Sequence, residues 1–164
     1  MSRGRGGSAA SITACHIRLQ KDFEDLETLS DCCTITFPDG PDKIQHFILR
    51  IKIIEGLYRN AKFDFDFVIP DNWPIERPKV KILTRVWHPN LTEPPEGGVC
   101  LNILRKNYTP TTTLATYVTS FQYLFNEPNP RDPLNTEAAM QYNQNYNAFK
   151  LKAEEYIQNY CPKD

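Results

Sequence analysis

The sequence KFDFDFVI, at residues 62–69, decides the fold. Its apolar side chains fall at every second position: Phe63, Phe65, Phe67 and Ile69. The positions between them hold two aspartates and a valine. Because successive side chains of a strand point to opposite faces, this alternation predicts a strand with one buried face and one polar face.

Strand patterns also occur on both sides of this stretch. They cover residues 33–37, 45–53 and 79–83. Short connections join these segments, and strands joined in this way are typical of an antiparallel meander. Residues 70–78 contain three prolines, which prevent regular strand pairing and indicate a rigid loop.

Helical patterns flank the predicted sheet. Ser11 is expected to cap a helix over residues 12–29, whose apolar side chains recur at helical spacing. The charged residues of this segment fall off the apolar stripe: Arg18, Lys21, Asp22 and Asp25. Further helices are predicted over residues 113–126 and 136–160, since prolines interrupt the pattern between them.

This order of elements predicts the α+β class. We expect one domain over residues 11–164, because that length is enough to bury a substantial core. Residues 1–10 consist mostly of Gly, Ser, Arg and Ala. Such a composition buries little apolar surface, so a flexible tail is predicted there.

Charge and hydropathy exclude several classes of protein. Nineteen basic and twenty acidic residues give a net charge of −1, so neither nucleic acid nor a membrane surface is an expected partner. No apolar run has the length of a membrane span, and the N-terminus lacks the apolar core of a signal peptide. We therefore expect a protein of the cytosol or nucleus.

The cysteines predict free thiols rather than a disulfide framework or a metal centre. There are five of them, an odd number, and no pair has the Cys-x-x-Cys spacing of a zinc or redox motif. The three histidines are dispersed along the chain. No metal site is expected from this pattern.

The long irregular segment at residues 84–111 is the candidate site, because such segments in compact domains are usually functional or disordered. It contains His88-Pro89-Asn90 and, after a Gly-rich stretch, Cys100. A thiol can hold an acyl group as a thioester, and an amide N–H can stabilise the oxyanion formed when that thioester is attacked. The alternative is that Cys100 is a buried structural thiol, as most lone cysteines are.

Several motifs now meet in one order along the chain. They are Trp73-Pro74, His88-Pro89-Asn90, Val99-Cys100-Leu101, Tyr123-Leu124-Phe125, Glu127-Pro128-Asn129-Pro130 and Asp132-Pro133-Leu134-Asn135. With them the chain resembles the ubiquitin-conjugating enzymes over about residues 12 to 150. Within that family it is most similar to the branch that carries the Nedd/Rub-type modifier, through Cys100 to Arg105 and the first-helix run Arg18 to Asp22.

The resemblance implies the ubiquitin-conjugating fold, with residues 11–164 as the catalytic core, and roles for three residues. Cys100 would be the thioester-forming nucleophile. Asn90 would stabilise the oxyanion, although a loop Asn more often holds its loop by bonding the backbone. Asp132 would orient the incoming lysine and help it to lose its proton, and the alternative is a turn-forming Asp before Pro133.

The resemblance also implies supporting roles and binding surfaces. Around the thiol, four residues are expected to shape the site: His88, Pro89, Leu101 and, at a gate position, Thr92. Ile75, Thr109 and Pro110 match the patches that ligases grip. Arg18 and Lys21 match the helix surface used by activating enzymes, with a merely solvated helix face as the alternative.

Four departures from the family pattern are visible, of which one is Arg77 in place of the first Pro of a common Pro-Pro-Lys. Asn90 and Cys100 are ten positions apart, two more than is usual in the family, which leaves the path of the intervening loop open. Tyr108 stands where the family usually has Trp. The segment before the first helix is short and Gly-Arg-Ser rich, so the arm interaction of the neddylation branch is expected to be absent or altered.

The implied function is that of a carrier. It would accept the modifier from the activating enzyme by transthiolation and pass it to a lysine, on cullins, with a RING-type ligase. No cofactor is expected, since ATP is used by the activating enzyme, and a monomer is expected. Three alternatives stay open: the same chemistry with ubiquitin, a non-catalytic modifier-binding relative, and a cysteine hydrolase, which lacks the local sequence of a known triad.

Overall fold

The alternating stretch forms β3 (Lys62–Val68), an inner strand of an antiparallel sheet. The structure, a computed structural model, describes residues 13–163. Over that range the sheet has four strands in the order β1-β2-β3-β4, a meander as the sequence predicts. The other three strands are β1 (Cys33–Thr36), β2 (His46–Lys52) and β4 (Lys79–Ile82).

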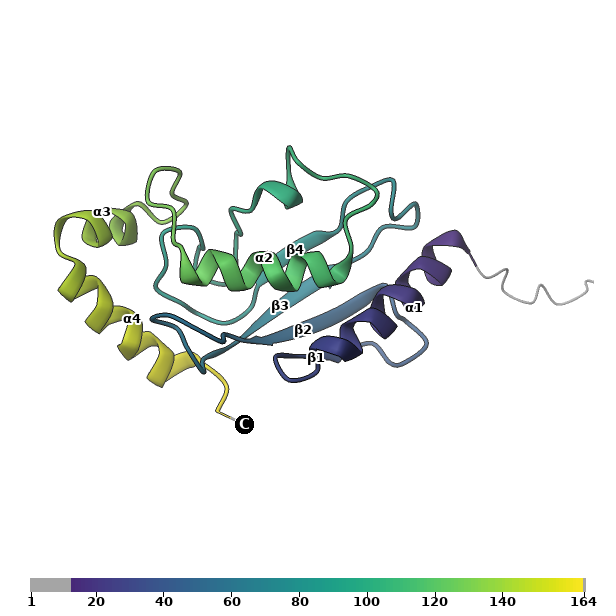
Figure 1. Ribbon diagram of the computed structural model, residues 1–164, viewed down its shortest axis with the longest axis horizontal. Coiled ribbons are helices and arrows are strands. Elements are labelled where there is room, and N and C mark those ends of the chain that lie inside the picture. The colour runs from purple at the N-terminus through teal and green to yellow at the C-terminus, as the bar shows by residue number, and fades with distance from the viewer. Residues whose placement is uncertain (1–12, 164) are drawn as a thin grey trace, which may run out of the picture.

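Helices lie across the sheet and at both ends of it (Figure 1). Their bounds are α1 (Ala14–Leu26), α2 (Leu114–Asn126), α3 (Thr136–Gln144) and α4 (Tyr146–Tyr160), with short 3₁₀ helices at Glu27–Leu29 and Asn102–Leu104. α2 crosses the sheet, α1 lies toward one end of the molecule, and α3 and α4 lie at the other. The predicted α+β class is confirmed.

The core contains aromatic rings of β3 that pair one to one with aromatic rings of α2, an arrangement called here the aromatic register. Phe63 stacks on Phe125 with ring centroids 4.4 Å apart, and Phe65 stacks on Phe121 at 4.2 Å. Phe67 meets Tyr117 edge-on at 5.7 Å. Two residues along a strand span about 6.8 Å, and four residues along a helix span about 6 Å. The two repeats therefore match, and each inward ring of β3 meets one ring of α2.

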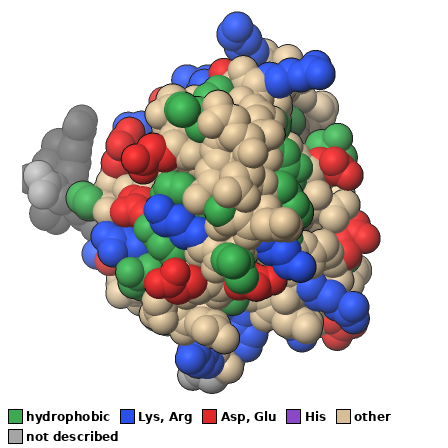
Figure 2. Space-filling view, turned by 90° about the vertical axis from the view of Figure 1, so that its left-hand side faces the viewer, with side chains coloured by type: hydrophobic (Ala, Val, Ile, Leu, Met, Phe, Trp, Pro, Cys, Tyr) green, Lys and Arg blue, Asp and Glu red, His purple; other side chains and the backbone are tan. Residues whose placement is uncertain are grey.

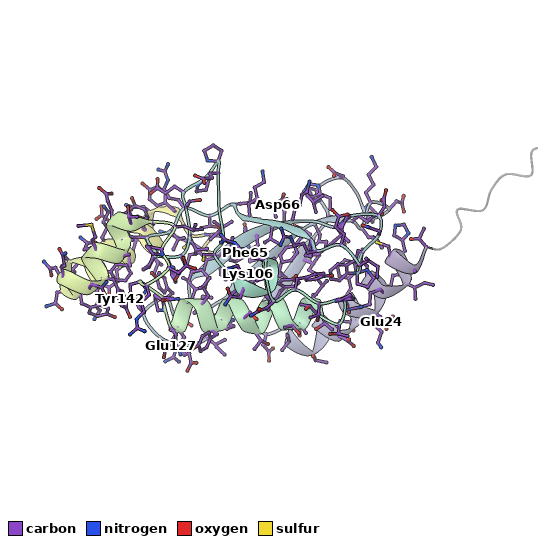
Figure 3. The ribbon with its side chains drawn as sticks, turned by 90° about the horizontal axis from the view of Figure 1, so that it is seen from above. Glu24, Phe65, Asp66, Lys106, Glu127 and Tyr142 are labelled. Carbon is purple, nitrogen blue, oxygen red and sulfur yellow. The ribbon has the colours of Figure 1, made fainter. Side chains whose placement is uncertain are left out.

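The opposite face of β3 is polar, as the alternation predicts. Phe65 and its neighbour Asp66, both labelled in Figure 3, lie on opposite sides of the strand. On the outer face Arg50 of β2 holds Asp64 with an Nε–Oδ1 distance of 2.8 Å. Charged side chains of both signs also mix over the end of the molecule that Figure 2 faces.

The first helix differs from the sequence prediction in two respects. Ser11, the predicted cap, and the predicted tail at residues 1–10 lie outside the described residues. The helix begins after Thr13, whose side chain accepts from the His16 amide at 3.2 Å. Asp22, predicted on the solvated face, is instead 1% exposed. Its Oδ1 accepts from Arg18 Nε at 3.4 Å, whereas its buried Oδ2 has no hydrogen-bond partner among the described residues.

The last helical segment was predicted as one helix over residues 136–160, which is wrong. It is two helices that part at Asn145. Asn145 ends α3 with a non-helical backbone, φ −150° and ψ 77°, and its side chain accepts from the Ala148 amide at 3.1 Å, which caps α4. The amide side chain supplies an alternative partner for backbone N–H groups, and apolar periodicity does not register that competition.

Two further observations concern residues 13–163. No helix in this part of the chain is both long and apolar enough to cross a membrane. Nor do three or more His, Cys, Asp or Glu side chains gather there in a group able to hold a metal ion.

The aromatic register makes a stability prediction. Phe65→Ala should lower the free energy of unfolding by about 3–5 kcal/mol, because it removes a fully buried ring and leaves a cavity against Phe121. Urea unfolding followed by circular dichroism measures this. Val68→Ala, at an exposed position of the same strand, is the control and should cost less than about 1 kcal/mol. Equal losses in the two variants would contradict the register as the main source of stability.

Candidate active site

Asn90 and Cys100 lie opposite one another at the open end of a small β-hairpin. The Cys100 amide donates to the Asn90 carbonyl at 2.9 Å, and the Thr92 amide donates to the Gly98 carbonyl at 3.0 Å. Leu91 and Val99 pair between them as an antiparallel bridge. The hairpin therefore places the thiol beside the His-Pro-Asn run by backbone pairing.

The extra length between Asn90 and Cys100 lies in the turn of this hairpin. Residues 93–97 form the turn beyond the Thr92–Gly98 pair. The pairing of residues 90–92 with residues 98–100 has no bulge. The path of the loop, which the spacing left open, is thus a regular hairpin with an enlarged turn.

Gly97 fastens that turn to the sheet. It has φ of 59°, in the left-handed region, and a Cβ there would collide with the carbonyl oxygen of Ile82 in β4. The Ile82 amide donates to the Gly97 carbonyl at 2.9 Å. Only glycine allows both the conformation and the close approach.

His88 joins the site to the core. Its ring is fully buried, with Nε2 3.0 Å from the Leu124 carbonyl of α2. Its Nδ1 accepts from the Asn90 amide at 2.9 Å. Burial lowers the pKa of His88 to about 4, so the ring is neutral at neutral pH, with its proton on Nε2 to satisfy both bonds. This geometry suits a structural group rather than a base.

Pro89 and Asn90 bind the loop at residues 129–135. The Pro89 carbonyl accepts from the amides of Leu134 and Asn135 at 2.9 and 3.0 Å. The Asn90 side chain accepts from the Asn129 amide at 2.8 Å and donates to the carbonyls of Asn129 and Asp132 at 2.8 and 3.2 Å. Both amide hydrogens of Asn90 are engaged, so in this conformation it holds the loop.

That loop brings Asp132 to the thiol. The Cys100 Sγ lies 3.6 Å from Asp132 Oδ2, as a donor to the carboxylate. Burial, and then the negative charge of Asp132, raise the pKa of the Cys100 thiol. Cys100 is therefore a protonated thiol at neutral pH. It is half-buried, which leaves its sulfur accessible.

Leu101 and Thr92 stabilise the two ends of the hairpin. Leu101 follows the thiol and packs partly against the core, and its carbonyl accepts from the Leu104 amide at 3.0 Å. The Thr92 hydroxyl accepts from the Gly98 amide at 2.5 Å, across the hairpin. In this conformation Thr92 closes the turn, and the gate role remains a prediction.

The two candidate ligase patches lie side by side. Ile75 is 73% exposed, and Thr109 and Pro110 are exposed as well. Tyr108, which replaces the family's usual Trp, donates its hydroxyl to the Pro74 carbonyl. This bond connects the loop that carries Ile75 with the loop that carries Thr109 and Pro110.

Arg18 holds the second of these loops against α1. Its guanidinium donates to the carbonyls of Pro110 and Thr112 at 2.8 and 2.9 Å. It also lies over the Trp73 ring, 5.5 Å from the centroid. Most of its donors are thus used within the chain, whereas Lys21 is exposed. Both remain predictions as contacts of an activating enzyme.

Sequence reasoning missed two residues that support the site. Tyr58 is fully buried, donates to the Trp87 carbonyl at 2.6 Å and packs against the His88 ring. Glu93, in the hairpin turn, contacts Tyr156 of α4. Neither belongs to a quoted motif, and their partners lie 29 and 63 residues away in sequence, so no local signal identifies them.

Comparison with known proteins gives the family. The sequence model of the ubiquitin-conjugating enzyme family matches residues 18–157, a range that includes the hairpin, its thiol and the loop that carries Asp132. The chain belongs to the ubiquitin-conjugating enzyme family. The resemblance seen in the sequence is confirmed, and the chain is an enzyme of this family.

Its relatives include three proteins from the neddylation branch. The chain is 40% identical over 157 residues to the Nedd8-conjugating enzyme UbcE2M of Drosophila melanogaster, covering 96% of this chain and 84% of that protein. It is 44% identical to the NEDD8-conjugating enzyme UBC12 of Yarrowia lipolytica, covering 88% and 79%. It is 40% identical to the NEDD8-conjugating enzyme UBE2F of Gallus gallus, covering 87% and 80%.

Solved structures give the same fold. A putative ubiquitin-conjugating enzyme from Plasmodium yoelii superposes with a TM-score of 0.84 at 28% identity, covering 93% of this chain and 98% of that one. The E2 domain of a Toxoplasma gondii ubiquitin-conjugating enzyme gives a TM-score of 0.79 at 27% identity, covering 89% and 99%.

The buried His88 predicts a pH dependence of stability. Its folded pKa of about 4 lies below the ordinary value of 6.5, so between these values the unfolded chain binds more protons. The stability that His88 contributes is therefore present above pH 6.5 and is lost as the pH falls toward 4. The slope from this group is at most about 1.4 kcal/mol per pH unit.

Denaturant unfolding at several pH values measures this slope. His88→Gln should flatten it in that window, whatever the variant does to stability at pH 7. The difference between the two proteins isolates His88, because His16 and His46 are present in both. Identical slopes would contradict the buried neutral ring.

The Cys100–Asp132 contact predicts a change in thiol reactivity. Asp132→Asn should move the pH profile of Cys100 alkylation to lower pH, because it removes the carboxylate charge that helps to raise the thiol pKa. Iodoacetamide labelling read by peptide mass spectrometry measures each cysteine separately. Cys32, whose pKa is raised by burial and then by Asp31, is the internal control and should keep its profile. An unchanged Cys100 profile would show that the two groups are not coupled.

Proposed function

We propose that this chain carries a Nedd8-type modifier as a thioester on Cys100 and transfers it to a lysine side chain. The observation that carries the proposal is the accessible Cys100 thiol, held beside Asp132 by the hairpin. The three named relatives, each called a Nedd8-conjugating enzyme, support the choice of modifier.

The first step is transthiolation. The Cys100 thiol loses its proton, and its sulfur attacks the carbonyl carbon of the thioester that joins the modifier to the activating enzyme. The activating enzyme's thiolate leaves and takes up a proton, so the exchange balances. One thioester replaces another, so the step is close to thermoneutral and needs no strongly acidic thiol. A raised pKa at Cys100 is compatible with this chemistry, and it limits reaction of the uncharged thiol with other electrophiles.

The second step is aminolysis. A lysine amine attacks the thioester carbonyl, the amine loses a proton, and the Cys100 thiolate leaves. Asp132, 3.6 Å from the sulfur, is close enough to orient the amine and to accept its proton. Asn90 would stabilise the oxyanion, a contribution of about 2.7–4 kcal/mol to the barrier. That role requires one of its present bonds to open, and the 3.2 Å bond to the Asp132 carbonyl is the longest.

The proposed partners follow from the surfaces. An activating enzyme, which uses ATP itself, would meet α1 near Lys21 and Arg18. A RING-type ligase would grip Ile75, Thr109 and Pro110, which lie on connected loops, and the acceptor would be a lysine of a cullin. We propose a monomer of the cytosol or nucleus without a cofactor of its own.

Ubiquitin is the second candidate modifier. The same site chemistry would serve it, and two of the structures that superpose well come from proteins described as ubiquitin-conjugating enzymes. The relatives of higher identity favour the Nedd8-type modifier. The non-catalytic relative and the cysteine hydrolase, which the sequence alone left open, do not fit a chain that belongs to this enzyme family.

A charging assay tests the proposal. The chain is incubated with ATP and matched pairs of activating enzyme and modifier, either Nedd8-type or ubiquitin, and is run on non-reducing gels. We expect an adduct with the Nedd8-type pair that thiols remove, and Cys100→Ser should give an adduct that thiols do not remove. Cys32→Ser is the matched control and should charge like wild type. An adduct with ubiquitin alone would select the second candidate, and no adduct would overturn both.

The discharge step tests whether Asn90 acts in aminolysis. Asn90→Ala should charge at close to the wild-type rate and discharge to free lysine about 10²-fold more slowly, because the oxyanion loses a donor. Timed gels of the isolated charged protein measure the rate. Discharge at the wild-type rate would remove Asn90 from the mechanism, both as an oxyanion donor and as the residue that holds the loop carrying Asp132.

A further inference from the structure

The enlarged turn of the active-site hairpin is fastened to the C-terminal helix. Glu93, the first residue of the turn, accepts a hydrogen bond from the Tyr156 hydroxyl of α4 through Oε1 at 3.0 Å. Its other oxygen lies 3.5 Å from Arg85 Nε. No step of the proposed mechanism uses Glu93, although it connects elements 63 residues apart.

The hydrogen bond from Tyr156 is the stronger of the two contacts. The Arg85 and Glu93 side chains are 43% and 37% exposed, and exposed ion pairs of this kind contribute little. A hydroxyl that donates to a carboxylate makes a charge-assisted bond, which is stronger than a neutral one. Tyr156 is a firm attachment point, because its ring packs on Trp87 at 5.7 Å and on Tyr160 at 5.2 Å.

The turn is held on a second side by the sheet. The Gly97 amide donates to the Glu93 carbonyl at 3.2 Å, and the Gly97 carbonyl accepts from the Ile82 amide of β4 at 2.9 Å. The two ends of the turn are thus bonded to each other, one to α4 and the other to β4. The bond from Tyr156 is thus a second attachment of the turn, independent of its contact with the sheet.

The Cys100 thiol lies close to the attached turn along the paired backbone of the hairpin. Between the turn and Cys100 lie only the Thr92–Gly98 and Leu91–Val99 pairs. A shift of the turn therefore passes along the paired backbone to Cys100 and its contact with Asp132. Small errors in the placement of reacting groups slow reactions strongly, because attack requires a narrow range of distance and direction.

We propose that Glu93 is a positioning residue, which acts through its bond to Tyr156 of α4 to hold the Cys100 thioester in the geometry for aminolysis. The inference rests on the proposed thioester function and adds to it a residue within the lengthened turn. The C-terminal helix thereby takes part in placing the nucleophile without touching it.

Single-turnover discharge tests the proposal. Each protein is charged with the Nedd8-type modifier, charging is stopped, and release to saturating free lysine is followed on non-reducing gels. The variants are Glu93→Ala, Glu93→Gln, Tyr156→Phe and the double variant Glu93→Ala/Tyr156→Phe. Glu96→Ala is the matched control, since Glu96 is exposed in the same turn and has neither contact. The first-order rate constant is the readout, because loss of folded protein lowers the amplitude and leaves that constant unchanged.

We expect Glu93→Ala and Tyr156→Phe each to slow discharge on the order of tenfold. The double variant should be no slower than Glu93→Ala, because both changes remove the same bond. Glu93→Gln retains an acceptor for the Tyr156 hydroxyl and should discharge at close to the wild-type rate, as should Glu96→Ala. If Glu93→Ala is too unstable to load, the Tyr156→Phe and Glu93→Gln results still decide.

Results that contradict the role of Glu93 can be told apart from results that contradict the proposed function. Wild-type discharge in Glu93→Ala or Tyr156→Phe would overturn the inference, as would losses that multiply in the double variant or a Glu93→Gln protein as slow as Glu93→Ala. In each of these cases the wild-type chain still charges and discharges. Failure of the wild-type chain to charge would instead overturn the proposed function.

Discussion

The active site depends on the contact between β3 and α2. The inward phenylalanines of β3 recur at nearly the same distance as the aromatic residues on one side of α2. This match fixes where α2 lies along the strand, and so where its C-terminal turn lies. Leu124 presents its carbonyl to His88 from that turn. The packing of the core therefore determines where the His-Pro-Asn run lies.

The site itself is assembled by backbone bonding around buried neutral groups. His88 connects α2 to Asn90, Asn90 connects the hairpin to the loop at residues 129–135, and that loop supplies Asp132. No strongly perturbed charge is needed, and the thiol is less acidic than an ordinary one. Such a site suits a carrier, which must hold an acyl group until an acceptor arrives. Its selectivity would come from its partners more than from the reactivity of the sulfur.

Much of this could be predicted from the sequence where one physical rule dominates. The alternation at residues 62–69 predicts the strand and its buried face, because burial of aromatic side chains outweighs local preferences. Motifs close together in the chain likewise predict Cys100 and Asn90 as site residues, and the structure brings the two together; their catalytic roles stay predictions. The prediction was wrong where a polar side chain finds a partner within the chain. Asn145 divides a helix that apolar spacing treats as continuous, because its side chain accepts from the Ala148 amide. Asp22 is buried beside Arg18, from which it accepts a hydrogen bond. The bond between Glu93 and Tyr156 spans 63 residues and has no local signature.

The regular pairing of Asn90 with Cys100 has a consequence for how this loop can change in length. Side chains along a paired strand alternate between two faces, so a one-residue change on one arm would turn the thiol away from Asp132. A change of length at the tip, between Thr92 and Gly98, leaves the pairs of the arms, and the sulfur, where they were. This hairpin can therefore vary in the length of its turn but not within its paired arms. The two residues by which the spacing between Asn90 and Cys100 exceeds the usual one lie in that turn.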